Sequence, residues 1–229
     1  MTKKITILGD SLTYGYLPMG EGKMADTDNW PIKLADLLAQ EYQLVNIEIR
    51  TDSQPGRTIV KPLVDFGFPQ DNVMDNLRAL YAKTSPFDLF IIFLGTNDYF
   101  GYDAYAKYNN LSDFNIEEKI VTSLHDIIKG IKNLYVGNYE DPDYKVLIIC
   151  PPKAITLNDG ELLTSLPGAY KNYFSKYNIP VLNLQEFANP GAEDQVKYDG
   201  IHYTPAETSA VAQAIFDIIT DQDLLRLNK

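Results

Sequence analysis

The stretch Lys4-Ile5-Thr6-Ile7-Leu8-Gly9-Asp10-Ser11, at residues 4–11, joins an apolar run to a polar turn. A short, nearly continuous run of apolar and β-branched residues is typical of a strand that is covered on both faces of a parallel sheet. Because the run ends at Gly9, Asp10 and Ser11 are expected at the carboxyl end of this strand. In doubly wound sheets, ligands bind at that edge.

Four further runs of the same kind follow at wide spacing, and helical patterns separate them. This alternation predicts an α/β fold, a three-layer α/β/α sandwich with a five-stranded parallel sheet. We expect the flavodoxin-like strand order 2-1-3-4-5, with the first strand in the centre. The expected strands are residues 4–8, 44–49, 88–94, 145–149 and 180–184. The expected helices are residues 30–42, 71–82, 116–135 and 162–177, and a fifth that begins at the capping sequence Thr204-Pro205-Ala206-Glu207.

Residues 1–229 are expected to form a single domain. No internal repeat or low-complexity linker divides the chain, and one domain of this length buries roughly 70 to 75% of its unfolded surface. Two long connections, residues 51–70 and 99–115, are unusual for a minimal α/β unit. The second is rich in aromatic residues, which fits a pocket wall or lid and also fits ordinary packing of an insertion.

Charge and composition disfavour several kinds of partner. The chain has 20 basic and 31 acidic residues, a formal net charge of -11. This charge repels nucleic acid and anionic lipid, and no basic run with interleaved aromatic residues is present. No stretch approaches the ~20 apolar residues of a membrane helix. Since the N-terminus has no apolar signal region, a cytoplasmic location is expected, although a mature exported form would look the same.

The chain contains one cysteine and two histidines, too few for a structural zinc cluster, so we expect neither a metal nor a cofactor. Cys150 follows an apolar run and is expected to be a buried, inert thiol. His125 lies within a long amphipathic pattern and is expected on the surface of a helix. His202 lies in Asp199-Gly200-Ile201-His202, just before the expected helix start at Thr204, and therefore on a loop.

Three polar segments are expected to meet at the carboxyl edge of the sheet. Ser11 follows the first strand, Gly56 follows the second, and Asn97 follows the third. Each segment alone is explained better by ordinary turn chemistry, in which Gly, Asp, Ser and Asn are frequent, than by catalysis. Their joint placement beside the switch point of the strand order favours a functional site.

These residue types match the needs of acyl transfer. A serine hydroxyl becomes a useful nucleophile when a base accepts its proton and a carboxylate orients that base. We expect Ser11 to be the nucleophile, His202 the base and Asp199 the orienting carboxylate. The main-chain N–H groups of Ser11 and Gly56 and the side-chain amide of Asn97 would form the oxyanion hole.

In this order, the segments resemble the sequence blocks of the GDSL or SGNH hydrolase superfamily, and the resemblance covers nearly the whole chain. The matching blocks are Gly9-Asp10-Ser11-Leu12, Gly56-Arg57-Thr58, Gly95-Thr96-Asn97-Asp98 and Asp199-Gly200-Ile201-His202. The resemblance implies an esterase or lipase-like enzyme of flavodoxin-like fold. It also implies that Ser11, Gly56, Asn97 and His202 are the name-giving residues and that Asp199 completes the triad.

Within the superfamily, residues 9–16, 56–58 and 199–203 are most similar to the arylesterase and acyltransferase branch. This likeness implies small acyl esters as substrates and a possible homo-oligomer. The chain has Pro55-Gly56 where that branch often has a serine-alanine pair, and the glycine keeps the N–H group.

The sequence therefore predicts a serine hydrolase that cleaves a small carboxylic ester, such as a short-chain acyl, aryl or O-acetyl carbohydrate ester, through an acyl-serine intermediate. Alternatives are an acyltransferase, thioesterase or lysophospholipase of the same fold, or a non-catalytic module that binds a small ligand at the same place. Tyr16, Tyr99, Phe100 and the loop at residues 151–161 are expected to shape the substrate pocket.

Overall fold

A computed structural model describes residues 2–43, 45–61, 72–110, 115–136, 145–156, 160–191 and 199–227. Its main sheet has five parallel strands in the order β2-β1-β3-β4-β7. These strands are β1 (Thr2–Gly9), β2 (Asn46–Ser53), β3 (Leu89–Phe93), β4 (Lys145–Cys150) and β7 (Val181–Asn183). When only this sheet is counted, the order is 2-1-3-4-5, so the sequence-based fold class is confirmed.

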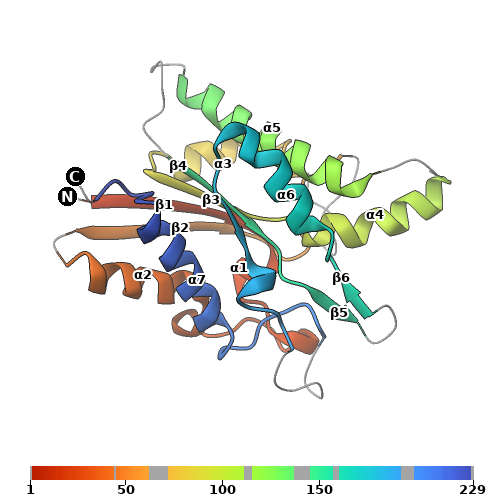
Figure 1. The fold of residues 1–229 in the computed structure, drawn as a ribbon, viewed down its shortest axis with the longest axis horizontal. Coiled ribbons are helices and arrows are strands. Elements are labelled where there is room, and N and C mark those ends of the chain that lie inside the picture. The colour runs from red at the N-terminus through yellow and green to blue at the C-terminus, as the bar shows by residue number, and fades with distance from the viewer. Residues whose placement is uncertain are drawn as a thin grey trace.

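Helices cover both faces of the sheet, which gives the three layers visible in Figure 1. On one face lie α2 (Trp30–Glu41) and α7 (Thr208–Asp221), which pack against each other. The other face carries α3 (Leu77–Thr84), α4 (Thr96–Asn109), α5 (Ile116–Val136) and α6 (Leu166–Phe174).

Strand β3 shows why the sequence runs are apolar throughout. Leu89, Ile91 and Phe93 point into the core beneath α2 and α7, whereas Phe90 and Ile92 point into the core on the opposite face. All five side chains are fully buried. Successive strand residues alternate between faces, and here both faces are covered, so no polar position interrupts the run.

The connection expected at residues 99–115 is largely a helix, which corrects the sequence-based prediction. Helix α4 begins at Thr96, directly after β3, and continues to Asn109. Tyr99, Phe100 and Tyr102 from this helix pack against the core on the α5 face. Phe and Tyr have modest helix propensity, so packing of these aromatic residues decides the structure here.

The segment expected as a loop at residues 151–161 contains a small antiparallel hairpin of β5 (Ala154–Thr156) and β6 (Gly160–Leu162). Leu162 therefore ends a strand and does not begin a helix, and α6 starts four residues later at Leu166. The helix expected at residues 71–82 begins at Leu77, and residue 71 lies outside the described part of the chain.

His125 is buried in α5, so the expectation of a surface histidine was wrong. Its ring centroid lies 4.0 Å from that of Tyr177, and its Nδ1 lies 3.1 Å from the Tyr173 hydroxyl oxygen. Burial lowers the pKa of His125. Cys150 is a buried free thiol, as expected, and burial raises its pKa. Within the described residues, no helix is both long enough and apolar enough to cross a membrane.

Candidate active site

A tight strand-to-helix turn presents Ser11 at the carboxyl end of β1. Short helix α1 (Ser11–Tyr14) begins immediately after Asp10, whose carboxylate caps it by accepting the Leu12 N–H at 3.0 Å. Gly9 permits this turn, since a Cβ atom there would lie 2.1 Å from Thr13 Oγ1. In the Gly-Asp-Ser motif, glycine thus leaves room for the Thr13 side chain, aspartate caps α1, and serine carries the hydroxyl group.

Ser11, His202 and Asp199 form a continuous chain of hydrogen-bond contacts. His202 Nε2 lies 2.9 Å from Ser11 Oγ, and His202 Nδ1 lies 2.7 Å from Asp199 Oδ2. Ser11 is only 6% exposed, so most of this residue is buried. The structure therefore brings together the three residues that the sequence predicted as nucleophile, base and orienting carboxylate.

The Asp199 carboxylate is held by main-chain donors as well as by the imidazole. Its Oδ1 accepts the N–H groups of Ile201 and His202, each at 2.9 Å, and its Oδ2 accepts the Met19 N–H at 3.3 Å. Burial would raise the pKa of Asp199, but the hydrogen bonds from the His202 side chain and from the N–H groups of His202 and Ile201, together with the charge of His202, outweigh it and lower the pKa to about 2. Asp199 is consequently ionised at neutral pH.

His202 lies on a loop, as expected, but the helix that follows starts later than its sequence suggests. Helix α7 begins at Thr208, and residues 205–207 form a turn before it. Glu207 Oε2 accepts the Thr204 N–H at 2.8 Å and the Thr204 hydroxyl at 3.0 Å. The glutamate half of a capping box is present, whereas the threonine hydroxyl donates and so does not cap the helix.

The segment after β2 is fixed against the end of β1. Gly9 O accepts the Gln54 N–H at 3.3 Å and Arg57 Nη1 at 3.2 Å. Gly56 has a φ of 76°, a left-handed conformation that favours glycine. Asn97, the second residue of α4, donates from Nδ2 to Arg57 O at 3.1 Å. Gly56 and Asn97 therefore reach the same edge of the sheet as Ser11.

Two buried carboxylates lie below this edge, and sequence reasoning gave neither of them a role in the site. Asp10 and Asp98 are both 0% exposed. Burial raises the pKa of Asp10 to about 6, although the Leu12 N–H and nearby His202 lower it. Burial also raises the pKa of Asp98 to about 7, against the lowering effect of two N–H groups, and the charge of Asp10 raises it further. No feature of the sequence indicates that these two carboxylates are fully buried.

Of the residues expected to shape the pocket, Tyr16 lies beside the histidine. Its ring centroid is 5.2 Å from that of His202, with the two planes inclined by 55°. Tyr99 and Phe100 contact each other edge to face at 6.3 Å and pack against the core beneath α4. Met19, whose N–H reaches Asp199, is a further residue that the sequence did not point to; its side chain is largely exposed and its φ is 56°.

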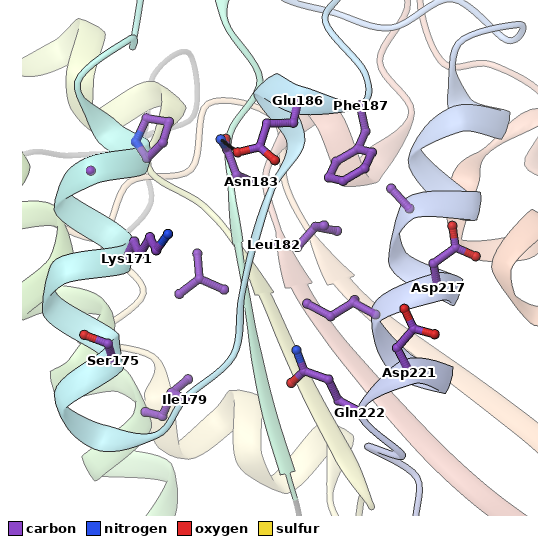
Figure 2. Close-up of a pocket in the computed structure, with 15 residues that line it drawn as sticks. Lys171, Ser175, Ile179, Leu182, Asn183, Glu186, Phe187, Asp217, Asp221 and Gln222 are labelled. Carbon is purple, nitrogen blue, oxygen red and sulfur yellow. Dashed lines mark hydrogen bonds between the residues drawn. The ribbon is translucent and has the colours of Figure 1, made fainter.

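A separate cleft of about 740 Å³ runs along the edge strand β7, between α6 and α7. Figure 2 shows Lys171 and Ser175 on the α6 side, Asp217 and Asp221 on the α7 side, and Leu182 of β7 between them. None of the residues predicted for the active site lines it. Among the described residues, no group of three or more His, Cys, Asp or Glu side chains is placed to hold a metal ion.

An α/β/α sandwich with a serine, a histidine and an aspartate in hydrogen-bond contact at the carboxyl edge of its sheet is an arrangement that serine hydrolases use. The chain belongs to the GDSL-like lipase/acylhydrolase family, whose model matches residues 5–215. This match confirms the family resemblance seen in the sequence blocks.

Solved structures with the same fold include a carbohydrate acetylesterase from Sinorhizobium meliloti, which is 22% identical with a TM-score of 0.74. The aryl esterase of M. smegmatis is 24% identical with a TM-score of 0.73, and a putative arylesterase from Agrobacterium tumefaciens is 23% identical with a TM-score of 0.72. Each comparison covers 96% of this chain and 99% of the other. The comparison with curated proteins found no match.

Proposed function

We propose that the protein is a carboxylic ester hydrolase that works through an acyl-Ser11 intermediate. Membership of the GDSL-like lipase/acylhydrolase family supports the reaction class. The observation that carries the assignment of residues is the pair of contacts through His202, 2.9 Å to Ser11 Oγ and 2.7 Å to Asp199 Oδ2. Both distances lie within hydrogen-bond reach, as proton transfer through the imidazole requires.

In this mechanism, Ser11 Oγ attacks the ester carbonyl carbon while His202 Nε2 accepts the hydroxyl proton. Asp199 accepts the Nδ1–H of the imidazole and stabilises the imidazolium that forms. The carbonyl oxygen becomes negative and is bound by the N–H groups of Ser11 and Gly56 and by Asn97 Nδ2. Collapse of the tetrahedral intermediate breaks the bond to the alcohol, which leaves with the proton from His202. Water then attacks the carbonyl carbon of the acyl-serine while His202 Nε2 accepts a proton from the water. Collapse of this second tetrahedral intermediate breaks the bond to Ser11 Oγ, which takes the proton back from His202, and the carboxylic acid leaves.

The substrate class we propose is a short acyl ester of a carbohydrate or an aryl alcohol. Structures of this fold include proteins named carbohydrate acetylesterase and aryl esterase; the first name specifies an acetyl ester of a carbohydrate and the second an aryl ester. Acyl transfer to an alcohol, and hydrolysis of a thioester or a lysophospholipid, would use the same residues with a different acceptor or leaving group. A panel of aryl and sugar esters of increasing acyl length, assayed with and without an alcohol acceptor, separates these cases.

The covalent step gives a direct test. A fluorophosphonate probe should label the wild-type protein and fail to label Ser11→Ala, because the probe reacts with an activated serine. Ser175→Ala is a matched control, since this exposed hydroxyl lies on a short helical turn after α6 and donates to Asn172 O at 3.4 Å. Absence of labelling in folded wild-type protein would instead favour a small-molecule binding module.

A further inference from the structure

Asp98 lies outside the proposed triad and oxyanion donors, yet it joins two elements that carry those donors. It is the third residue of α4 and is completely buried. A single oxygen, Oδ1, accepts the N–H of Ile59 at 2.8 Å and the N–H of Val60 at 2.7 Å. Asp98 therefore connects the start of α4 to the segment that follows β2.

The neighbouring residue makes the reciprocal contact. Asn97 Nδ2 donates to Arg57 O at 3.1 Å, so residues 97 and 98 bond to the segment at residues 57–60 in both directions. Gly56 directly precedes this segment. The 3.5 Å contact of Asn97 Nδ2 with Asp10 Oδ2 is long, which leaves the second Nδ2 hydrogen available for an oxyanion. These three hydrogen bonds join the start of α4 to the segment beside Gly56, and Asp98 accepts two of them.

We propose that Asp98 is a positioning residue that aligns the two oxyanion donors contributed by Gly56 and Asn97. This inference rests on the proposed ester hydrolysis and extends it by one residue. Oxyanion donors stabilise a transition state only when they are held in place before the reaction, so a residue that fixes both donors acts on turnover more than on substrate binding.

The two carboxyl oxygens of Asp98 differ in their contacts, and only one of them can hold the oxyanion donors in place. Asp98 Oδ2 is buried and has no hydrogen-bond partner among the described residues, whereas Oδ1 accepts both N–H groups. Burial also favours the neutral carboxyl group, in agreement with the raised pKa of about 7. The proposed positioning role therefore depends on the acceptor oxygen Oδ1 and not on a negative charge. An asparagine at this position retains an acceptor oxygen.

The test compares Asp98→Ala with Asp98→Asn. We expect Asp98→Ala to lower kcat at least tenfold with a change in KM below about threefold, and to slow fluorophosphonate labelling of Ser11 by a similar factor. Asp98→Asn retains the acceptor oxygen and should restore most of the lost turnover. The matched control is Asp88→Ala: Asp88 also accepts a main-chain N–H, from Lys4 at 2.8 Å, but at the amino end of β3.

A double variant separates positioning from general destabilisation. If Asp98 acts through the oxyanion donors, Asp98→Ala should cost less in an Asn97→Ala background than in wild type, because one of its targets is already gone. Full additivity, unchanged kcat in Asp98→Ala, or equal losses in Asp98→Ala and Asp98→Asn would each overturn the proposal. If Asp98→Ala does not fold, a drop in kcat of tenfold or more in folded Asp98→Asn overturns it as well. The wild-type protein tests the proposed function separately. If it hydrolyses esters and reacts with the probe while the variants give any of these results, the role of Asp98 is refuted and the proposed hydrolase function stands.

Discussion

His202 Nε2 lies 2.9 Å from Ser11 Oγ, although 191 positions separate the two residues in the chain. Contacts made by the residues that directly follow the histidine hold its loop in place. The buried Tyr203 donates its hydroxyl to Ala188 O at 3.0 Å, and Lys33 of α2 donates to Pro205 O at 2.7 Å. Since these contacts involve no substrate, the imidazole is oriented toward Ser11 before any ester binds.

The first prediction concerns the carboxylate behind the imidazole. Asp199→Asn should lower kcat on the order of 10⁴-fold, as the equivalent change does in the serine protease triad, because an amide cannot stabilise the imidazolium or the correct tautomer. Turnover of p-nitrophenyl acetate measures the effect. Asp217→Asn, an exposed position on α7, should leave turnover unchanged. A loss of less than tenfold in Asp199→Asn would remove Asp199 from the mechanism.

The second prediction concerns the side-chain oxyanion donor. Asn97→Ala should lower kcat about 10²- to 10³-fold with little change in KM, the usual cost of removing one oxyanion donor. The exposed Asn172→Ala in α6 serves as the control, and thermal unfolding of both variants checks that the fold is retained. Normal turnover in Asn97→Ala would show that this amide does not contact the reacting oxygen.

The sequence predicted most of the sheet because strands buried on both faces leave a strong local signal. In β3, five successive apolar residues alternate between two cores, as expected of a strand that is covered on both faces. Gly9, Ser11 and His202 were also identifiable, because their residue types and their order in the chain match a known set of blocks.

Features that depend on long-range contacts could not be predicted. Helix α4 is stabilised by packing of aromatic residues against α5, and its own sequence of Tyr, Asn, Gly and Asp gives little helical signal. Burial of His125 results from Tyr173 and Tyr177, which follow it in the chain by about 50 positions. The sequence around Asp98 is typical of an ordinary turn, and only the structure shows that its Oδ1 accepts the N–H groups of Ile59 and Val60.

The third prediction concerns Gly95, between β3 and α4. Its φ is 119°, and a Cβ atom would lie 2.4 Å from the Tyr170 hydroxyl, which donates to Leu94 O at 2.8 Å. Gly95→Ala should therefore lower the free energy of unfolding by about 2 to 4 kcal/mol, through overpacking and backbone strain.

Gly168→Ala in α6 is the control for this change, because nothing lies within 4 Å of the added Cβ. It should raise the free energy of unfolding by about 0.5 to 1 kcal/mol, since alanine favours the helix. Urea unfolding of the two variants gives both values. Equal effects in the two proteins would contradict the steric role of Gly95.

The last prediction uses the buried carboxyl group of Asp98. Its pKa in the folded protein is raised to about 7 from 3.8, so the folded state holds a proton that the unfolded chain releases between these two values. The contribution of neutral Asp98 to stability is therefore present below pH 3.8 and is lost as the pH rises through about 7. Asp98→Asn cannot ionise, so it should gain stability relative to wild type by up to roughly 4 kcal/mol between pH 4 and 8.

Urea unfolding of wild-type protein and Asp98→Asn at several values between pH 5 and 8 measures this difference. The interval avoids the titration of Asp199, whose pKa is lowered from 3.8 to about 2 in the folded protein. Its contribution to stability is present above pH 3.8 and is lost only as the pH falls through about 2. Asp10, with a pKa of about 6, is common to both proteins and contributes to both curves. Free energies of unfolding that run parallel over this interval would show that Asp98 is already ionised in the folded protein, as it is in the unfolded chain. Curves that diverge between pH 5 and about 7 would establish a buried neutral carboxyl group next to the proposed oxyanion hole.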